Sequence, residues 1–451
     1  MSETVTFQHL LTILEQTFAG LPDVRTGRNT IYRVRDAAMA AFSVFFMQSP
    51  SFLAHQQAMQ DQQQRNNATS LFGIDKIPSD PQIRNLLDPV TPAALSAPFW
   101  AIFQLLEEAG GLQAGAPWAR CLDGQWLASL DGTQYFSSNK LHCARCTVRV
   151  HQGVEYYAHT AITPVLVAPG ESRVISLEPE FIQPQDGQEK QDCAPKGLPN
   201  AGKRWLARHA ANLAQHSVTL LGDDLYCNQP FCEQVLAQGL NFIFTCKPDS
   251  HAALYQEVEL LNHLGAVTQL TERRWNGRTH EVWRYRYVND VPLRADPAAR
   301  QVNWCESMMV DESTGALGYH NSFATNHRLT DHNVAAIVAA GRARWKIENE
   351  NNNVLKHYGY HLEHNFGHGE HYLAMVLVLL NLLAFLVHTV LDLCDTLYQR
   401  LRTHLRVRQT FFNDLRTLTR YLFFDSWDHL LHFMYVQLEL DQPSKGRSRK
   451  R

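Results

Sequence analysis

Three acidic positions in the sequence are spaced so that a folded chain could bring them to one metal site. Asp131 follows a predicted strand in LASLDGTQY, and Asp223 and Asp224 end the apolar strand VTLLGDD. Glu348 lies in the predicted helix RARWKIENE. Ligand sites gather at strand ends in open α/β sheets, and carboxylates that meet there repel one another unless a cation binds between them. Hard oxygen ligands suit Mg²⁺ or Mn²⁺, and two such ions support phosphoryl transfer.

Two choices within this acidic set stay open from the residues alone. The second acid is Asp223 or its neighbour Asp224, and the helical acid is Glu348 or Glu350. Residues two apart on a helix point in different directions, so only one of the two glutamates can face the metals. The alternative is that each acid is an ordinary strand-end or surface residue.

The segments around these acids predict a mixed α/β sheet with helical crossovers. Apolar, β-prone runs alternate with helical patterns between residues 121 and 254, and aromatic, β-prone pieces predict a β-rich insertion at 255–325. A single long helix is expected over 331–358, with Thr330 or Asp331 as its N-cap. Residues 1–120 show helical spacing of their apolar residues.

Length and composition favour a multidomain globular protein. The chain has 451 residues, of which 45% are hydrophobic and 19% charged, and its net charge is −3. A wholly basic DNA-binding coat is therefore excluded, and any nucleic-acid surface must be local. The expected divisions are a helical N-terminal region (1–120), two parts of a catalytic domain (121–254 and 326–395), the insertion (255–325) and a basic helical C-terminal region with a disordered tail (396–451).

Residues 372–391 form an apolar stretch long enough to span a bilayer. It contains Asn381 and His388, which are costly in a membrane, so a buried core helix is the preferred interpretation. The first residues lack the basic start and apolar stretch of a signal peptide, and nine cysteines are too few for a disulfide scaffold. These features predict a cytoplasmic protein without a membrane span.

Long strings in the sequence resemble the DDE transposases of bacterial insertion sequences. The strings are LDGTQYFSS, PEFIQPQDGQEKQDC, KRWL, LLGDDLY, RWKIENENNNVLK and GYHLEHNFGHG with the apolar helix behind it. The resemblance spans about residues 120–395 and includes the subgroup feature of a β-rich insertion before the Glu helix. It implies an RNase H-like catalytic fold.

The resemblance also implies roles for the acids. Asp131 would be the first catalytic Asp and Glu348 the catalytic Glu, together holding two Mg²⁺ or Mn²⁺ ions. Asp223 is preferred as the second Asp, because the family's acid usually follows the Gly directly. Two departures are that Gly341 stands where the related motif has Tyr, and that Lys356 falls one residue beyond the expected Lys.

Basic and aromatic residues supply candidate DNA contacts. Arg344 and Lys356 would clamp phosphates beside the metals, or form a surface salt-bridge stripe. Residues 271–300 hold seven Arg against four acids, interleaved with Trp and Tyr. Basic residues there would contact phosphate and exposed aromatics would stack on bases, unless the aromatics are cross-strand packing pairs. The candidates are Arg274, Trp275, Arg284 and Arg286. Six Arg within 399–420 are a second candidate face.

Cys143 and Cys146 have the spacing of a zinc knuckle. A complete structural zinc site needs two more ligands, for which His151, His159 and Cys193 are candidates; otherwise the cysteines are plain thiols. Five histidines lie between residues 357 and 371, and we expect them to bond loop backbone or DNA phosphate rather than a metal.

The function expected from the resemblance is DNA transposition. The enzyme would hydrolyse the phosphodiester at transposon ends, and the freed 3′-hydroxyl would attack target DNA. Its partners would be the terminal inverted repeats, with the N-terminal region as a candidate reader, and target DNA, bound by a homodimer or higher oligomer. The alternatives are a metal-dependent nuclease without strand transfer and a non-catalytic DNA-binding protein derived from a transposase.

Overall fold

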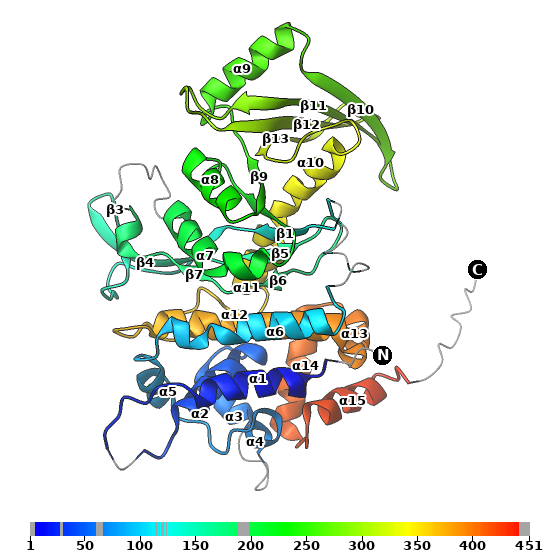
Figure 1. The fold of residues 1–451 in the computed structure, drawn as a ribbon. Helices are drawn as coiled ribbons and strands as arrows, with labels where there is room; N and C mark the ends of the chain where they lie inside the picture. Colours follow the sequence, from blue (N-terminus) through cyan, green and yellow to red (C-terminus); the bar gives the residue numbers. More distant parts are fainter. Residues whose placement is uncertain are drawn as a thin grey trace, which may run out of the picture. The chain divides into compact units, whose positions relative to one another are not determined.

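The computed structural model describes residues 5–27, 30–59, 66–112, 124–187 and 198–441, with residues 116, 118, 121 and 122. The chain forms two compact units (Figure 1). Unit 1 combines residues 1–111, 134–159 and 353–451, and unit 2 combines residues 112–133 and 160–352. The predicted disordered tail after residue 441 and the candidate zinc ligand Cys193 lie outside the described residues.

Unit 2 is built on a nine-stranded mixed sheet, which confirms the predicted mixed α/β class. From one edge to the other the strands are β6 (Ile175–Ser176), β5 (Val165–Val167), β1 (Trp126–Ser129), β8 (Val218–Gly222), β9 (Asn241–Thr245), β13 (Leu317–Thr325), β12 (Gln301–Asp311), β11 (His280–Pro292) and β10 (Thr268–Trp275).

The centre of this sheet is parallel. Strand β1 pairs with β8, and β8 with β9, in parallel register, whereas β5 and β6 add antiparallel strands on the other side of β1. Helices α7 (Leu198–Leu213) and α8 (Gln229–Ala237) are the helical elements that precede β8 and β9. All residues of β1 and β8 are buried, as expected for central strands covered on both faces.

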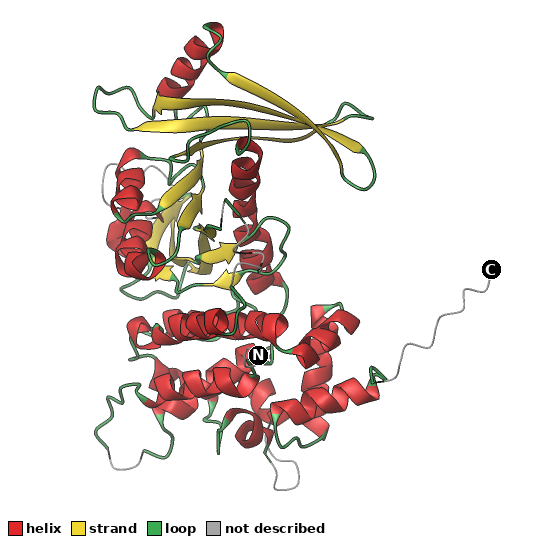
Figure 2. Cartoon of the chain, turned by 45° about the vertical axis from the view of Figure 1, so that its right-hand side comes forward, coloured by secondary structure: helices red, strands yellow, loops and turns green. Residues whose placement is uncertain are grey.

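The predicted β-rich insertion forms a helix and four antiparallel strands. Helix α9 (Ala252–His263) leads into β10, and β10 to β13 follow as a meander of long strands (Figure 2). Strand β13 then pairs antiparallel with β9, with Phe323 opposite Thr245. The insertion therefore continues the central sheet without a break in hydrogen bonding.

The segment that carries Glu348 is helical but not one uniform α-helix, so that prediction was wrong in detail. It consists of α10 (Val334–Arg342), a 3₁₀ turn (Ala343–Trp345), a π-helical turn (Ile347–Asn352) and α11 (Asn353–His357). The N-cap is Asn333, not Thr330 or Asp331, and the Thr330 amide donates to the Asn333 side chain at 2.8 Å. A run of poor helix formers in NENNN coincides with the wide turn.

Unit 1 is mainly helical, with a small hairpin of β3 (Thr147–His151) and the start of β4 (Val154–Ile162). Residues Gln152 and Gly153 join these strands with positive φ angles of 50° and 77°, as a two-residue hairpin turn requires. Strand β2 (Gly132–Ser138) belongs to the same sheet, and β7 (Glu180–Phe181) pairs with the end of β4.

The helices of unit 1 are α1 (Phe7–Ala19), α2 (Val34–Phe46), α3 (Phe52–Met59), α4 (Asn67–Phe72), α5 (Asp80–Leu87), α6 (Ala97–Glu108), α12 (Leu373–Cys394), α13 (Thr396–His404), α14 (Arg408–Tyr421) and α15 (Trp427–Gln437).

Helix α12 is the core of unit 1. Among the described residues it is the one unbroken helix apolar and long enough to cross a membrane, yet it is buried and packs against α2, α6 and α13. Its polar residues have protein partners: the Asn381 amide donates to the Tyr360 carbonyl at 2.7 Å, and His388 lies 2.6 Å from the Tyr360 hydroxyl. These features are those of a buried core helix. The linear division of the sequence had grouped α12 with the Glu348 segment, whereas it lies in the helical unit.

Candidate active site and metal centre

Asp131 and Asp223 lie at the carboxyl ends of neighbouring parallel strands. The register of β1 and β8 pairs Ser129 with Leu221, so the two strands end at the same edge of the sheet. Asp223 follows β8 directly, and Asp131 lies two residues beyond β1. Burial and the nearby charge of Asp223 raise the pKa of Asp131 to about 6. The fold therefore brings the first two predicted acids within electrostatic reach of each other.

The third acid, Glu348, is joined to this pair by Arg344. The Arg344 Nη1 atom lies 3.0 Å from Glu348 Oε1 and 4.0 Å from Asp131 Oδ2. The charge of Glu348 also contributes to the raised pKa of Asp131. Thus Asp131, Asp223 and Glu348, which the sequence predicted as one set, lie together in unit 2.

The backbone around Asp131 is held in place by a buried polar network. Asp131 Oδ1 accepts a hydrogen bond from the Gly132 amide at 2.8 Å, and the Asp131 carbonyl accepts one from the Thr163 amide at 3.0 Å. The Thr163 hydroxyl donates to Asn352 Oδ1 at 2.9 Å, and Asn351 Nδ2 donates to Thr163 Oγ1 at 3.2 Å. This network connects the first Asp to the turn that carries Glu348.

A second link runs between the same two segments. The Ser129 hydroxyl, at the end of β1, donates to the Arg344 carbonyl at 3.3 Å. The sequence analysis missed Ser129, Thr163, Asn351 and Asn352, because no motif or spacing marks these small polar residues as partners. The one available signal was the run of three Asn residues so close to Glu348 in a predicted helix, since Asn is a poor helix former.

Asp223 and Asp224 have different surroundings. Burial raises the pKa of Asp223, against the opposing effect of Arg344. Asp224 instead faces the turn after β9: its Oδ1 accepts from the Lys247 amide at 2.7 Å and lies 3.3 Å from His251 Nε2. Burial opposes ionisation of Asp224, but the hydrogen bonds from His251, Ser250 and Lys247 outweigh it and lower its pKa. The geometry therefore favours Asp223 as the acid of the cluster.

Two glycines explain local features of the motifs. A Cβ at Gly222 would lie 2.8 Å from the ring of Tyr226, so the glycine before Asp223 lets that buried ring pack against the backbone. A Cβ at Gly341 would lie 2.7 Å from the ring of Phe323. Because α10 approaches β13 this closely, the position where the related motif has Tyr has no room for a side chain in this chain.

The acidic cluster offers oxygen donors, but among the described residues its three carboxylates are not one of the groups whose ligand atoms all lie within 4.8 Å of one another. The Arg344 guanidinium lies near the carboxylates of Asp131 and Glu348 and acts electrostatically on Asp223, and the pKa of Asp131 is raised because burial and its neighbours' negative charges oppose its ionisation. The oxygen donor set matches what Mg²⁺ or Mn²⁺ prefers. Glu348 keeps 35% of its side-chain surface exposed, so the cluster is open to solvent on that side.

Arg344 and Lys356 differ in their surroundings. Arg344 lies in the acidic cluster with 9% of its side chain exposed. Lys356 belongs to unit 1, where its Nζ atom pairs with Glu363 Oε1 at 2.8 Å. The rival acid Glu350 lies in the same π-helical turn as Glu348. The spacing from Arg344 to Lys356 does not follow a regular α-helix, because a 3₁₀ turn and a π-helical turn lie within this segment.

The aromatic residues of the insertion are mostly packing residues. Trp283, Tyr285 and Tyr287 are buried, whereas Trp275 is 60% exposed. The idea that these aromatics as a group are exposed for base stacking is therefore wrong, and the alternation in WRYRY was the signal of a buried face. Trp275 remains the exposed candidate, opposite His280 in the β10–β11 register.

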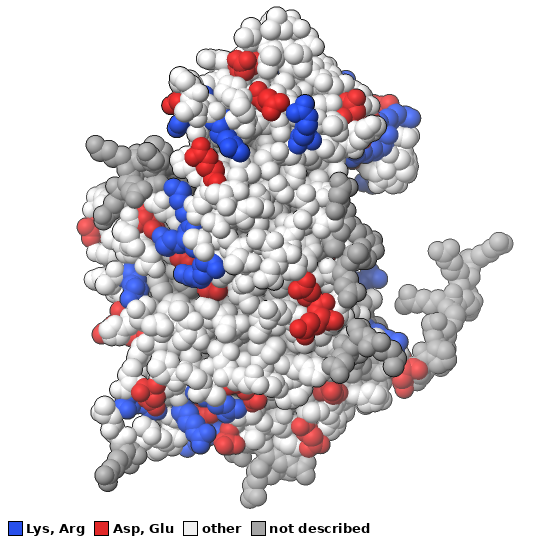
Figure 3. All heavy atoms as spheres, viewed as in Figure 1, with Lys and Arg blue, Asp and Glu red and all other residues white. Residues whose placement is uncertain are grey.

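Several arginines of the insertion already have acidic partners. Arg274 pairs with Glu272, and Arg286 lies 3.0 Å from Glu306, whereas Arg284 is exposed. The face in Figure 3 likewise shows basic and acidic side chains interspersed. A DNA surface here would have to compete with these ion pairs.

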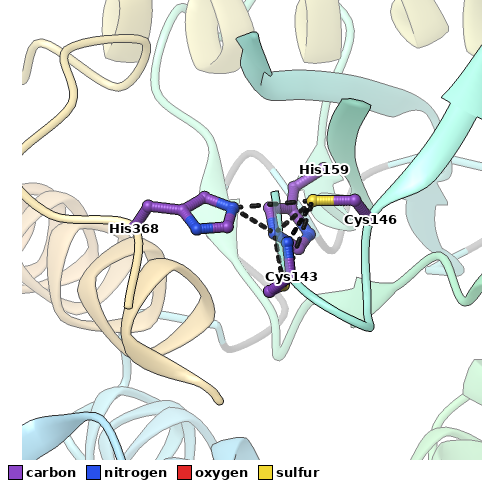
Figure 4. Close-up of side chains that lie close together, drawn as sticks. All are labelled: Cys143, Cys146, His159 and His368. Atoms are coloured by element: carbon purple, nitrogen blue, oxygen red, sulfur yellow. Dashed lines mark hydrogen bonds between the residues drawn. The ribbon is translucent and has the colours of Figure 1, made fainter. Parts of the chain in front are cut away.

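Four sulfur and nitrogen ligands converge in unit 1. Cys143, Cys146, His159 and His368 place their ligand atoms within 4.8 Å of one another (Figure 4). Cys143 and Cys146 were predicted, and His159 was one of three candidates for a further ligand; His151 is not in the cluster. His368, one of the histidines at 357–371, bonds loop backbone as expected, through Nδ1 and the Gly369 carbonyl, but its Nε2 atom also joins this cluster, which was not expected. Burial would raise the pKa of Cys143, but hydrogen bonds from His159 and His368 lower it to about 5.

A second group, Cys227, Cys246 and His251, also lies within 4.8 Å in unit 2. The pKa of Cys227 is raised well above its usual value by a hydrogen bond with Cys246 and by burial, which favours a neutral thiol. This group offers three ligands where the unit 1 cluster offers four, so the unit 1 cluster is the better metal candidate.

Comparison of the sequence with protein-family models gave no match, and neither did a search of curated proteins. The geometry of the two sites therefore carries the functional argument.

Proposed function

We propose that the protein is a DDE-type DNA transposase whose catalytic centre is Asp131, Asp223 and Glu348. The observation that carries this proposal is the meeting of these three acids around Arg344 in unit 2, although they are far apart in sequence. The resemblance of the surrounding strings to insertion-sequence transposases supplies the substrate class, which is DNA.

The sheet supports the finer assignment of an RNase H-like core. Strands β6, β5 and β1 are antiparallel, and β8 and β9 continue from β1 in parallel, each preceded by a helix. The two aspartates lie at adjacent strand ends, and the glutamate comes from a helical segment after the insertion. This combination of a mixed sheet with acids on its central strands is what the proposed fold requires.

The three carboxylates would hold divalent cations, which when bound activate the attacking oxygen and stabilise the leaving oxygen in phosphoryl transfer. The chain's own contribution is positioning. The Thr163 network and the Ser129 bond fix the segments that carry the acids, and Arg344 keeps Glu348 next to Asp131. If a bound cation took over the Glu348 carboxylate, the Arg344 guanidinium would be free to donate a charge-assisted hydrogen bond to a phosphate oxygen.

The test is a cleavage and joining assay with labelled DNA that carries the element's ends. Asp131→Asn, Asp223→Asn and Glu348→Gln should each reduce end cleavage on the order of 10³-fold or more, because each removes a charge needed for cation binding. Asp224→Asn and Glu350→Gln are the matched neighbours and should retain cleavage within about 10-fold.

The outcomes separate the alternatives. Cleaved ends that are also joined to target DNA support a transposase, whereas cleavage without joined product supports a nuclease. Binding of the ends without cleavage by the wild-type protein supports the non-catalytic alternative. Unchanged cleavage by Asp131→Asn, with the variant folded as judged by circular dichroism, would overturn the catalytic assignment.

A further inference from the structure

We propose that Cys143, Cys146, His159 and His368 form a structural zinc site within unit 1. Three of the ligands come from the β-hairpin region, and the fourth comes from the loop before α12 (Figure 4). This site is separate from the acidic cluster of unit 2 and does not depend on the proposed catalytic function.

The distances between the ligand atoms match the edges of a zinc tetrahedron. With Zn–S of about 2.3 Å and Zn–N of about 2.0–2.1 Å, the edges should be about 3.8 Å for S–S, about 3.6 Å for S–N and about 3.3 Å for N–N. The Sγ atoms of Cys143 and Cys146 are 3.9 Å apart. His159 Nε2 lies 3.5 Å from Cys143 Sγ and 3.4 Å from Cys146 Sγ.

The distances to the fourth residue, His368, also match the edges of this tetrahedron. His368 Nε2 lies 3.5 Å from Cys146 Sγ and 3.2 Å from His159 Nε2. Five separate distances therefore agree with one tetrahedron to within about 0.2 Å. The two sulfurs are too far apart for a disulfide bond, which needs about 2.05 Å.

The donor set identifies the metal class. Two thiolates and two imidazoles suit Zn²⁺ and not the hard cations expected at the carboxylates. Four protein ligands leave no open coordination position, which is typical of a structural rather than a catalytic zinc. Cys146 and His159 are buried, so the ion would be largely shielded from solvent.

The surroundings of the ligands are arranged as a metal site needs. His368 Nδ1 donates to the Gly369 carbonyl at 2.9 Å, which leaves Nε2 with its lone pair toward the cluster. The Cys143 amide lies 3.5 Å from Cys146 Sγ and the Cys146 amide donates to the Cys143 carbonyl at 3.2 Å, forming a tight knuckle turn. The ring of Phe136 packs 4.4 Å from that of His368.

The structural role follows from what the site connects. Cys146 and His368 are 222 residues apart in sequence. The far end of the loop is already fixed, because Asp88 accepts backbone hydrogen bonds from residues 370–373, including 3.0 Å from His371 and Leu373. Zinc would fix the hairpin to the same point, so the ion ties the small sheet of unit 1 to the start of its core helix.

The experiment measures metal in the full-length protein purified without chelators. Mass spectrometry should find about one zinc per chain, and Co²⁺ substitution should give visible d–d bands and a thiolate charge-transfer band typical of tetrahedral S₂N₂ sites. His368→Ala and Cys146→Ser should lower zinc content on the order of 10-fold or more. His371→Ala, an exposed histidine three residues from the ligand, is the control and should retain zinc.

A rescue variant separates metal loss from misfolding. His368→Cys offers a Cys₃His set, so it should regain near-stoichiometric zinc and the wild-type thermal midpoint, which His368→Ala lowers by about 5 °C or more. Folded wild-type protein that contains no zinc and gives no tetrahedral cobalt spectrum would overturn the proposal. A disulfide between Cys143 and Cys146 in that protein would overturn it as well. None of these measurements requires DNA, so they are independent of the proposed transposase activity.

Discussion

Arg344 and Glu348, four residues apart, form an ion pair of 3.0 Å, and the same guanidinium lies 4.0 Å from Asp131. One cation of the protein thus balances two carboxylates that come from different parts of the sequence. Arg344 therefore links the Glu348 segment electrostatically to Asp131.

Arg344→Gln should therefore destabilise the metal-free protein. The half-buried carboxylate of Asp131 and the partly exposed Glu348 would lose their counter-charge, at a cost of about 1–2 kcal/mol in the free energy of unfolding. Added Mn²⁺ should recover more stability in this variant than in the wild type, because the cation replaces the missing charge. Urea denaturation at pH 7.5 with and without Mn²⁺ measures both effects.

The control for this variant is Arg328→Gln, which breaks the exposed ion pair between Arg328 and Asp290. Arg328 keeps 75% of its side chain exposed, so its loss should cost about 0–0.5 kcal/mol. Equal stabilities of the two variants would contradict the role given to Arg344.

The raised pKa of Asp131 predicts a pH-dependent gain in stability from Asp131→Asn. Between the ordinary value of 3.8 and the folded value of about 6, the folded state binds more protons than the unfolded state, so stability falls as pH rises through this window. The asparagine removes that cost. The gain should be absent below pH 4 and reach about 1–3 kcal/mol above pH 6. Denaturation of metal-free protein across pH 4–8 provides the measurement.

Asp224→Asn should behave in the opposite sense. The pKa of Asp224 is lowered by its hydrogen bonds to the turn at 247–251, so the ionised side chain stabilises the fold above its ordinary pKa and this contribution is lost as pH falls. The variant should thus be less stable than the wild type at neutral pH. A stabilising effect of both substitutions at pH 7 would show that the two aspartates are not distinguished as described.

Thr163→Val should weaken catalysis through positioning. Valine keeps the shape of threonine but leaves the buried side chains of Asn351 and Asn352 without their shared hydroxyl, at about 1–3 kcal/mol of stability. Because these asparagines lie in the π-helical turn of Glu348, the cleavage rate should fall about 10-fold or more. Single-turnover cleavage at saturating DNA measures this rate. Thr163→Ser keeps the hydroxyl and should restore most of it; failure of serine to do so would argue against the network.

Trp275→Ala and Trp283→Ala should separate DNA contact from packing. Trp275 is 60% exposed, so its removal should change stability by less than about 0.5 kcal/mol and weaken end binding by about 1–3 kcal/mol if a base stacks on it. Trp283 is 4% exposed, and its removal should cost about 3–5 kcal/mol of stability. Fluorescence anisotropy with labelled DNA and urea denaturation provide the two readings. If Trp275→Ala bound DNA with unchanged affinity, Trp275 would not be a DNA-contacting residue.

The strand ends that carry the acids were predictable because a buried apolar run followed by Asp is a local signal. Asp131 and Asp223 each follow such a run, and their adjacency then depends only on which strands pair. The choice of Asp223 over Asp224 was not predictable from pattern alone. It depends on the turn after β9, in which the Lys247 amide donates a hydrogen bond to the Asp224 carboxylate.

The fourth residue of the proposed zinc site illustrates what sequence spacing cannot supply. His368 is one of five histidines between residues 357 and 371, and nothing local in the sequence distinguishes it from His364 or His371. The start of α12, close to His368, is held by Asp88, which caps the C-terminal end of α5 and is distant in the sequence. By contrast, the CxxC knuckle was visible because its two ligands lie in one turn.

The π-helical turn at 347–352 leaves the Glu348 segment with one residue more than a regular α-helix would accommodate there. Expelling that residue toward either end would rotate one side of the helix by about 100° against the other, since each residue advances an α-helix by that angle. Such a shift of register would move the Glu348 carboxylate relative to Asp131 and Asp223 without any hinge motion between domains. A change of register in this turn would therefore alter the distance between the glutamate and the two aspartates.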